Sequence, residues 1–117
     1  MKTKEYQKEA KRTLASLGSK LGDEMHMAMG LVTEAGEFLD VYKKTYAYDK
    51  KIDYVNLKEE LGDILWYVAN FCNVNKWSME EVMEININKL KVRYPEKFTQ
   101  ENAINRNLEE ERKVLEQ

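Results

Sequence analysis

Apolar residues recur along most of this chain at the three- and four-residue spacing of an amphipathic helix. The spacing predicts a first helix with an apolar stripe from Tyr6 to Leu17, ending near Gly18. A second predicted helix begins at Asp23, which we interpret as its N-cap, and runs to about Tyr46. We therefore expect the N-terminal part of the chain to form two consecutive helices.

The same periodicity continues through the rest of the chain with clear start and stop signals. Asp53 is placed to cap a third helix, whose apolar stripe reaches Phe71 and is broad enough for burial on two sides. Ser78 opens a pattern typical of a capping box and predicts a fourth helix, which Pro95 ends because proline lacks a backbone donor. From about Asn105 the chain is rich in Glu and Arg with few apolar anchors, so we expect a marginal helix that packs on a partner subunit or frays.

Composition agrees with this helical pattern and limits the possible partners. The chain has 117 residues with one proline and five glycines, which favours a single all-α domain over residues 1–117. We predict a four-helix-bundle-like core with an additional C-terminal helical segment. The net charge of -2 gives no bulk attraction for a nucleic acid polymer, so none is expected as a partner.

Cysteine content limits the kinds of metal site that are possible, and hydropathy indicates where in the cell the protein resides. Cys72 is the only cysteine, which excludes an internal disulfide and a site built from several thiolates. No apolar stretch is long enough to span a bilayer, and the N-terminus has no apolar signal core. We expect a cytoplasmic protein without a membrane partner.

Two short acidic motifs share one pattern, in which two carboxylates stand three residues apart around a glycine: Glu34-Ala35-Gly36-Glu37 and Glu60-Leu61-Gly62-Asp63. Residues three apart share a helix face, so two such helices packed together would bring four carboxylates to one point. Like charges that lose their hydration repel one another, and a divalent cation removes this cost. We predict a site for Mg²⁺, for which Mn²⁺ can substitute, because hard cations prefer oxygen ligands.

The glycines of the two motifs need a physical reason. Glycine in a helix interior costs roughly 1 kcal/mol relative to alanine. We expect Gly36 and Gly62 to let the second and third helices approach closely, which would draw the flanking carboxylates into one coordination sphere. The alternative for each acidic pair is a solvated helix face with salt bridges to nearby lysines.

Further residues supply groups that suit a nucleotide. Asn86, Lys89 and Arg93 share one helix face, and together they offer an amide, a compact cation and a planar fork for phosphate oxygens. Tyr67 lies one turn after Asp63 on the acidic face and is a candidate contact for a nucleobase. Without the acids, the lysine and arginine would be ordinary surface residues.

The order of these motifs resembles the MazG-like nucleoside triphosphate pyrophosphohydrolases of the all-α type. The resemblance rests on the two acidic motifs followed by Asn86, Lys89, Leu90 and the run Arg93-Tyr94-Pro95. It implies hydrolysis of a nucleoside triphosphate to the monophosphate and pyrophosphate, with the four acids as magnesium ligands and Lys89 and Arg93 on the phosphates. We take Glu37 as the candidate base for the attacking water.

The resemblance also implies a homodimer or a homotetramer, which agrees with long helices that expose more apolar surface than the chain can cover. Two noncatalytic alternatives remain open at this point, a nucleotide-binding regulator and a helical interaction protein. The sequence argues against a di-iron carboxylate bundle, because that design needs two Glu-x-x-His motifs and His26 is the only histidine.

Overall fold

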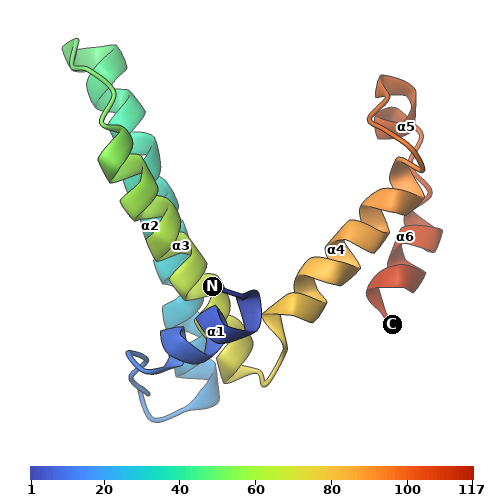
Figure 1. The fold of residues 1–117 in the computed structure, drawn as a ribbon, viewed down its shortest axis with the longest axis horizontal. Helices are drawn as coiled ribbons and strands as arrows, with labels where there is room; N and C mark the ends of the chain where they lie inside the picture. Colours follow the sequence, from blue (N-terminus) through green and yellow to red (C-terminus); the bar gives the residue numbers. More distant parts are fainter. The chain divides into compact units, whose positions relative to one another are not determined.

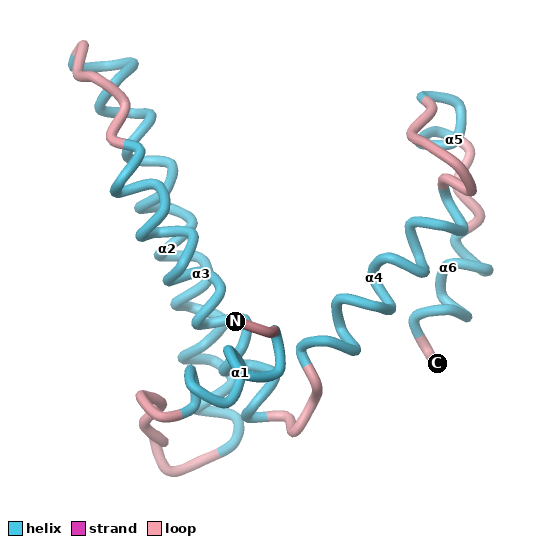
Figure 2. Tube along the Cα trace, in the orientation of Figure 1, coloured by secondary structure: helices cyan, strands magenta, loops and turns pink.

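The computed structural model describes residues 1–117 and contains helices and no strand, which confirms the all-α prediction (Figure 1). Loops separate six helices (Figure 2): α1 (Thr3–Lys11), α2 (Lys20–Tyr48), α3 (Tyr54–Val74), α4 (Met79–Arg93), α5 (Gln100–Ile104) and α6 (Leu108–Leu115). The chain divides into two compact units, Met1–Met79 and Glu80–Gln117.

Helices α2 and α3 form a hairpin that dominates the first unit, and they lie side by side along their length (Figure 1). The turn between them is short, and the helix ends on both sides of it are capped. Asp49 adopts a left-handed conformation with φ 52° at the end of α2, and its backbone N–H donates to the Lys44 carbonyl. The Asp53 carboxylate accepts a hydrogen bond from the Asn56 backbone N–H at 3.1 Å, which confirms Asp53 as the N-cap of α3.

Gly30 of α2 is the glycine at which a side chain of α3 packs directly on the helix backbone. The Tyr67 ring lies so close to this backbone that a Cβ at Gly30 would overlap it. The expectation for Gly36 and Gly62 was wrong, because both are exposed and a Cβ at either would meet nothing within 4 Å. Their outward position follows from the helix repeat, since each stands between two residues that face the neighbouring helix.

Helix α1 is held on α3 by side-chain amides. Asn70 is fully buried and donates to the Ala10 carbonyl at 3.1 Å, while Asn73 donates to the Gln7 carbonyl at 3.1 Å. Gln7 in turn donates to the Asn73 side-chain carbonyl at 3.0 Å and accepts from the Met79 backbone N–H at 2.8 Å. These bonds give the amides of Gln7, Asn70 and Asn73 partners on the other helix, so they fix where α1 sits on the hairpin.

The first two helices have different ends from those predicted. Helix α1 stops at Lys11, well before Leu17, because the following chain turns back on the Asp23 carboxylate. That carboxylate accepts from the Leu17 backbone N–H at 2.6 Å, so Asp23 organises the preceding loop. Ser19 is the N-cap of α2, and the prediction of Asp23 in that role was wrong.

The second unit contains α4, α5 and α6. Helix α4 ends at Arg93, before Pro95 as predicted, whereas the short helix α5 was not predicted. The C-terminal segment forms α6 and is tied to its own chain. Glu111 of α6 is buried and accepts from Arg93 at 2.7 Å and from Arg106 at 3.0 Å.

Helix α2 leaves a long apolar stripe uncovered, which we name the outer seam. Its members alternate four and three residues apart, the repeat of a coiled-coil helix, and all are exposed: Leu21, Met25, Ala28, Val32, Ala35, Leu39, Tyr42 and Tyr46. Tyr54, Leu61 and Leu65 continue a similar exposed stripe on α3. None of the helices combines the length and apolarity needed to cross a bilayer.

The two kinds of glycine predict opposite effects on stability. Gly30→Ala should lower the free energy of unfolding by about 1–3 kcal/mol, because overpacking against Tyr67 outweighs the gain in helix propensity. Gly36→Ala should leave it unchanged or raise it by up to about 1 kcal/mol. Urea unfolding followed by circular dichroism measures both. Equal stability of the two variants would contradict the Gly30–Tyr67 contact.

Candidate functional site

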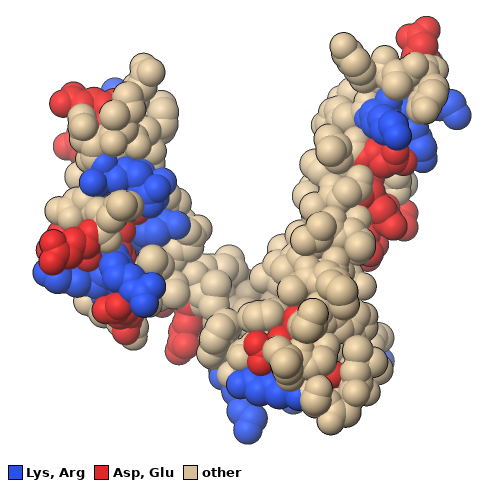
Figure 3. Space-filling model, turned by 180° about the vertical axis from the view of Figure 1, so that it is seen from behind, with Lys and Arg blue, Asp and Glu red and all other residues tan.

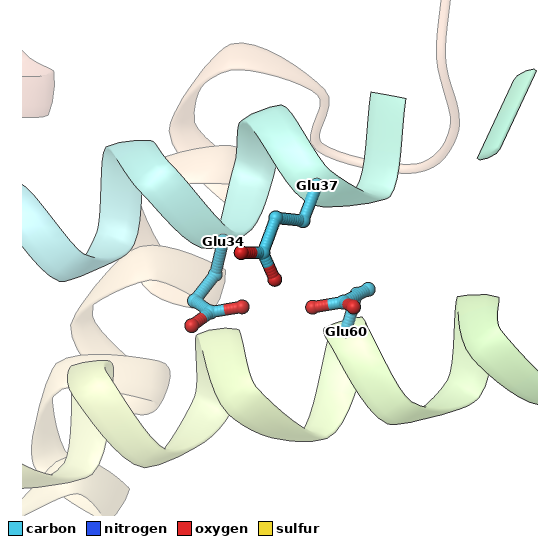
Figure 4. Close-up of side chains that lie close together, drawn as sticks. All are labelled: Glu34, Glu37 and Glu60. Carbon is cyan, nitrogen blue, oxygen red and sulfur yellow. The ribbon is translucent and has the colours of Figure 1, made fainter. Parts of the chain in front are cut away.

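Three of the four predicted acids meet between α2 and α3. Glu34 and Glu37 extend from α2 and Glu60 from α3, and their carboxylates point toward one another (Figure 4). One ligand oxygen from each lies within 4.8 Å of the others, a spacing at which three carboxylates can hold a metal ion. The hairpin thus brings together side chains from the two acidic motifs.

The cluster contains carboxylate oxygens that have no partner in the protein. Glu60 is only 6% exposed, and its Oε1 accepts a hydrogen bond from the Asn56 side-chain amide at 3.1 Å. The other oxygen of Glu60, Oε2, is buried and unpaired, as is Oε2 of Glu34. A buried carboxylate oxygen without a donor is costly, and a cation is the partner that suits both atoms. The donor set, all carboxylate oxygen, fits a hard divalent ion.

Electrostatic repulsion within the cluster is large enough to change the protonation of Glu34. The close approach of the Glu60 carboxylate, burial, and the proximity and charge of Glu37 raise the pKa of Glu34 to about 7. Asp63, half-buried on α3, lies outside the group of three, but its charge also raises the pKa of Glu34. The fourth predicted acid is therefore close enough to act on the cluster.

Tyr67 has a packing role next to this cluster. Its half-buried ring covers Gly30, lies edge-on to Trp66 with the ring centroids 4.9 Å apart, and lies edge-on to His26 at 6.2 Å. These contacts hold the ring on the α2–α3 interface one turn from Asp63. Contact with a nucleobase stays a prediction for Tyr67.

The predicted phosphate contacts lie on α4, in the second unit. Asn86 is exposed, and Lys89 is half-buried with no ion pair. Arg93 is already engaged, because its Nη2 donates to Glu111 at 2.7 Å and its side chain is only 17% exposed. Lys89 is therefore the member of this trio whose charge is uncompensated.

Sequence reasoning missed two features of these sites. Asn56 stands four residues before Glu60 on α3 and donates to it, a relation that the helix repeat could have shown. Glu111 binds Arg93 from a segment that reads as a solvated charged helix, and Arg106 joins it through two hydrogen bonds. No local spacing marks that ion-pair cluster, because its members come from separate elements.

Comparison with known proteins assigns the fold and the acidic hairpin to one family. The model of the MazG nucleotide pyrophosphohydrolase domain matches residues 23–98, which cover most of α2 and all of α3 and α4. This chain belongs to that family. The MazG resemblance carried by the ordered acidic and Lys/Arg motifs is thereby confirmed, and with it membership in a family of nucleotide pyrophosphohydrolases.

A curated relative of this MazG chain comes from a bacteriophage. The chain is 40% identical over 72 residues to the Gene 37 protein of Mycobacterium phage L5. The matched region covers 58% of this chain and 63% of the phage protein, so the chain spans less than two thirds of the length of that relative. No solved structure matches the chain.

The raised pKa of Glu34 predicts how stability depends on pH. Between the ordinary carboxyl pKa of 4.5 and about 7, folded Glu34 keeps a proton that the unfolded chain releases. The Tm of the metal-free protein should therefore fall as pH rises through this window, because the folded state binds more protons. Differential scanning calorimetry across the window measures the slope.

Glu34→Gln is the matched control, since a neutral amide cannot titrate. Its Tm should change less across the same window, and Mg²⁺ should raise the Tm of the unmodified protein most at the upper end of the window. An identical slope in Glu34→Gln would remove Glu34 as the titrating group.

Proposed function

We propose that this MazG protein is a Mg²⁺-dependent nucleoside triphosphate pyrophosphohydrolase that releases a nucleoside monophosphate and pyrophosphate. One observation carries the proposal: carboxylates of α2 and α3 converge within 4.8 Å and keep two buried oxygens unpaired. A site with this surplus of negative charge is suited to a divalent cation that also binds the oxygens of a polyphosphate. The family match supports the same class of reaction.

The metal ligands in this proposal are Glu34, Glu37, Glu60 and Asp63, with Mg²⁺ as the ion and Mn²⁺ as a substitute. When bound, the ion neutralises phosphate charge and makes the α-phosphorus easier to attack. The carboxylates contribute in two ways. Glu60 is fixed by Asn56, so its free oxygen keeps its direction, and Glu34 must give up its proton to act as a ligand.

Glu37 is our candidate for the general base. It is the exposed member of the cluster, so a water molecule can reach its carboxylate. In the proposed step the water oxygen bonds to the α-phosphorus while the bond from that phosphorus to the bridging oxygen breaks. The bridging oxygen leaves with pyrophosphate and keeps the electron pair, and the water proton passes to Glu37.

The nucleotide contacts stay proposals on the residues that the sequence indicated. Lys89 has an uncompensated charge that suits a phosphate, and Asn86 stands one turn before it on α4. Arg93 keeps further N–H groups for a phosphate while Glu111 holds one edge of its guanidinium. Tyr67 offers an aromatic ring for the base.

A homodimer or a homotetramer is the second part of the proposal. The outer seam exposes large side chains, with Val32 at 73% and Leu39 at 67% exposure. An alternation of four and three residues over the whole of α2 is the pattern that packs against another helix, and neither α1 nor α3 of the first unit covers it. A second copy offers a seam of the same kind.

The reaction is tested with a panel of nucleoside triphosphates and Mg²⁺, in which pyrophosphate is resolved from orthophosphate. Glu37→Gln and Asp63→Asn should each lower kcat at least about a hundredfold, because each removes a group from the metal and water site. Circular dichroism should show unchanged helicity.

Glu59→Gln is the control for this assay. Glu59 neighbours Glu60 but is exposed and forms no ion pair, so its loss should leave turnover unchanged. Full activity in both site variants would defeat the assignment. Binding of nucleotide without any turnover would favour a regulator instead of an enzyme.

The assembly is tested by sedimentation velocity. The double variant Val32→Glu/Leu39→Glu should shift the protein to the monomer, since two carboxylates on the outer seam would be buried without partners. Val55→Glu is the control, because Val55 is 79% exposed on α3 and lies outside the seam. A double variant that sediments like the unmodified protein would exclude the seam as the interface.

A further inference from the structure

A cavity of about 240 Å³ opens at the tip of the α2–α3 hairpin, where α2 ends and α3 begins. Three of its lining residues are lysines, contributed by the end of α2 and by the connecting turn. The full lining consists of Val41, Lys44, Lys50, Lys51, Asp53 and Asn56. In Figure 3, Lys and Arg atoms gather near the tip of this hairpin, next to a run of Asp and Glu atoms.

The cavity continues the line of the carboxylate cluster. On α2, Val41 and Lys44 follow Glu37 at intervals of four and three residues, so they lie on the same side of the helix. On α3, Asn56 lines the cavity and its amide donates to Glu60 at 3.1 Å. One side chain therefore touches both the cavity and the cluster, which places them about one helical turn apart, or about 5 Å.

The charge of the cavity is only partly compensated. Lys44 pairs with Asp40 at 3.2 Å, but Lys50 and Lys51 form no ion pair. Asp53 also lines the cavity, where it caps α3 by accepting from the Asn56 backbone N–H and keeps its negative charge, so the two unpaired lysines exceed it by one positive charge. Two free ammonium groups beside a pocket are suited to an anion with several oxygens.

We propose that this lysine cavity binds the β- and γ-phosphates of the nucleotide, the part that leaves as pyrophosphate. This inference rests on the proposed function. Along the hairpin from its tip the order is the lysine cavity, the carboxylate cluster and then Tyr67, which matches the order of terminal phosphates, α-phosphate and nucleoside in the substrate. The cavity thus assigns a direction to the bound nucleotide.

The lysines also have a chemical role in this arrangement. Negative charge builds up on the bridging oxygen and the β-phosphate as the bond to the α-phosphorus breaks. Ammonium groups held beside the leaving phosphates stabilise that charge, and they do so more effectively in a cavity than in open water. Lys50 and Lys51 are therefore expected to lower the barrier as well as to strengthen binding.

The double variant Lys50→Gln/Lys51→Gln tests the cavity, with inorganic pyrophosphate and Mg²⁺ as the probe in isothermal titration calorimetry. Its Kd for pyrophosphate should rise about tenfold or more, because two charge-assisted contacts are lost. The Ki of pyrophosphate as a product inhibitor should rise by a similar factor, while the Ki of the nucleoside monophosphate stays unchanged.

Lys43→Gln is the matched control, because Lys43 is an exposed lysine of the same helix that lines a different surface cavity. It should leave both constants unchanged. Lys50→Arg/Lys51→Arg should keep most of the affinity, since the charges remain. Unchanged pyrophosphate binding in the glutamine variant would overturn the proposal, and so would an equal loss in Lys43→Gln.

The same measurements separate this inference from the proposed function. If the unmodified protein hydrolyses nucleotides and the glutamine variant matches it in every constant, the lysine cavity fails and the reaction stands. If the unmodified protein binds pyrophosphate through these lysines and hydrolyses no nucleotide, the reaction fails and the cavity stands.

Discussion

Repulsion among carboxylates at the α2–α3 interface is the constraint on which the rest of this structure depends. Glu34 and Glu60 occupy interface positions that a helical hairpin would normally fill with apolar side chains, and Glu37 lies beside them at the exposed edge. The folded chain tolerates this only by keeping Glu34 protonated into the neutral range and by giving Glu60 an amide donor. The proton on Glu34 is released when a cation enters, whereas the amide hydrogen bond keeps Glu60 in place, so the metal-free hairpin is poised to bind one.

The neighbouring contacts keep the hairpin together despite this repulsion. The Tyr67 ring seated on Gly30 brings the helix backbones close on one side of the acids, and the caps at Asp49 and Asp53 define the turn on the other. The amides of α1 and α3 then fix a third helix on this frame. A carboxylate cluster on two helices that are anchored on both sides of it keeps a defined geometry.

The local sequence pattern was sufficient to predict those structural features that depend only on neighbouring residues in the chain. Helical periodicity predicted α2, α3 and α4, the cap at Asp53 and the stop before Pro95, and the spacing of acids indicated a shared face. Periodicity tells which residues share a face, but it does not tell which neighbour that face meets. For this reason the close approach was assigned to Gly36 and Gly62 when it belongs to Gly30. The same limit explains why the partner of Arg93 was missed, because Glu111 reaches it from a separate helix.

The outer seam lies on the same helix as Glu34 and Glu37, and this shared helix limits where residues can be inserted into the chain. Each residue turns a helix by about 100°, so one residue inserted between Gly30 and Glu34 would rotate both acids and the later part of the outer seam away from the Gly30 contact and the earlier part of the seam. The irregular stretch between α1 and α2 carries no such phase relation. Natural or engineered insertions are therefore tolerable before Ser19 and disruptive inside α2.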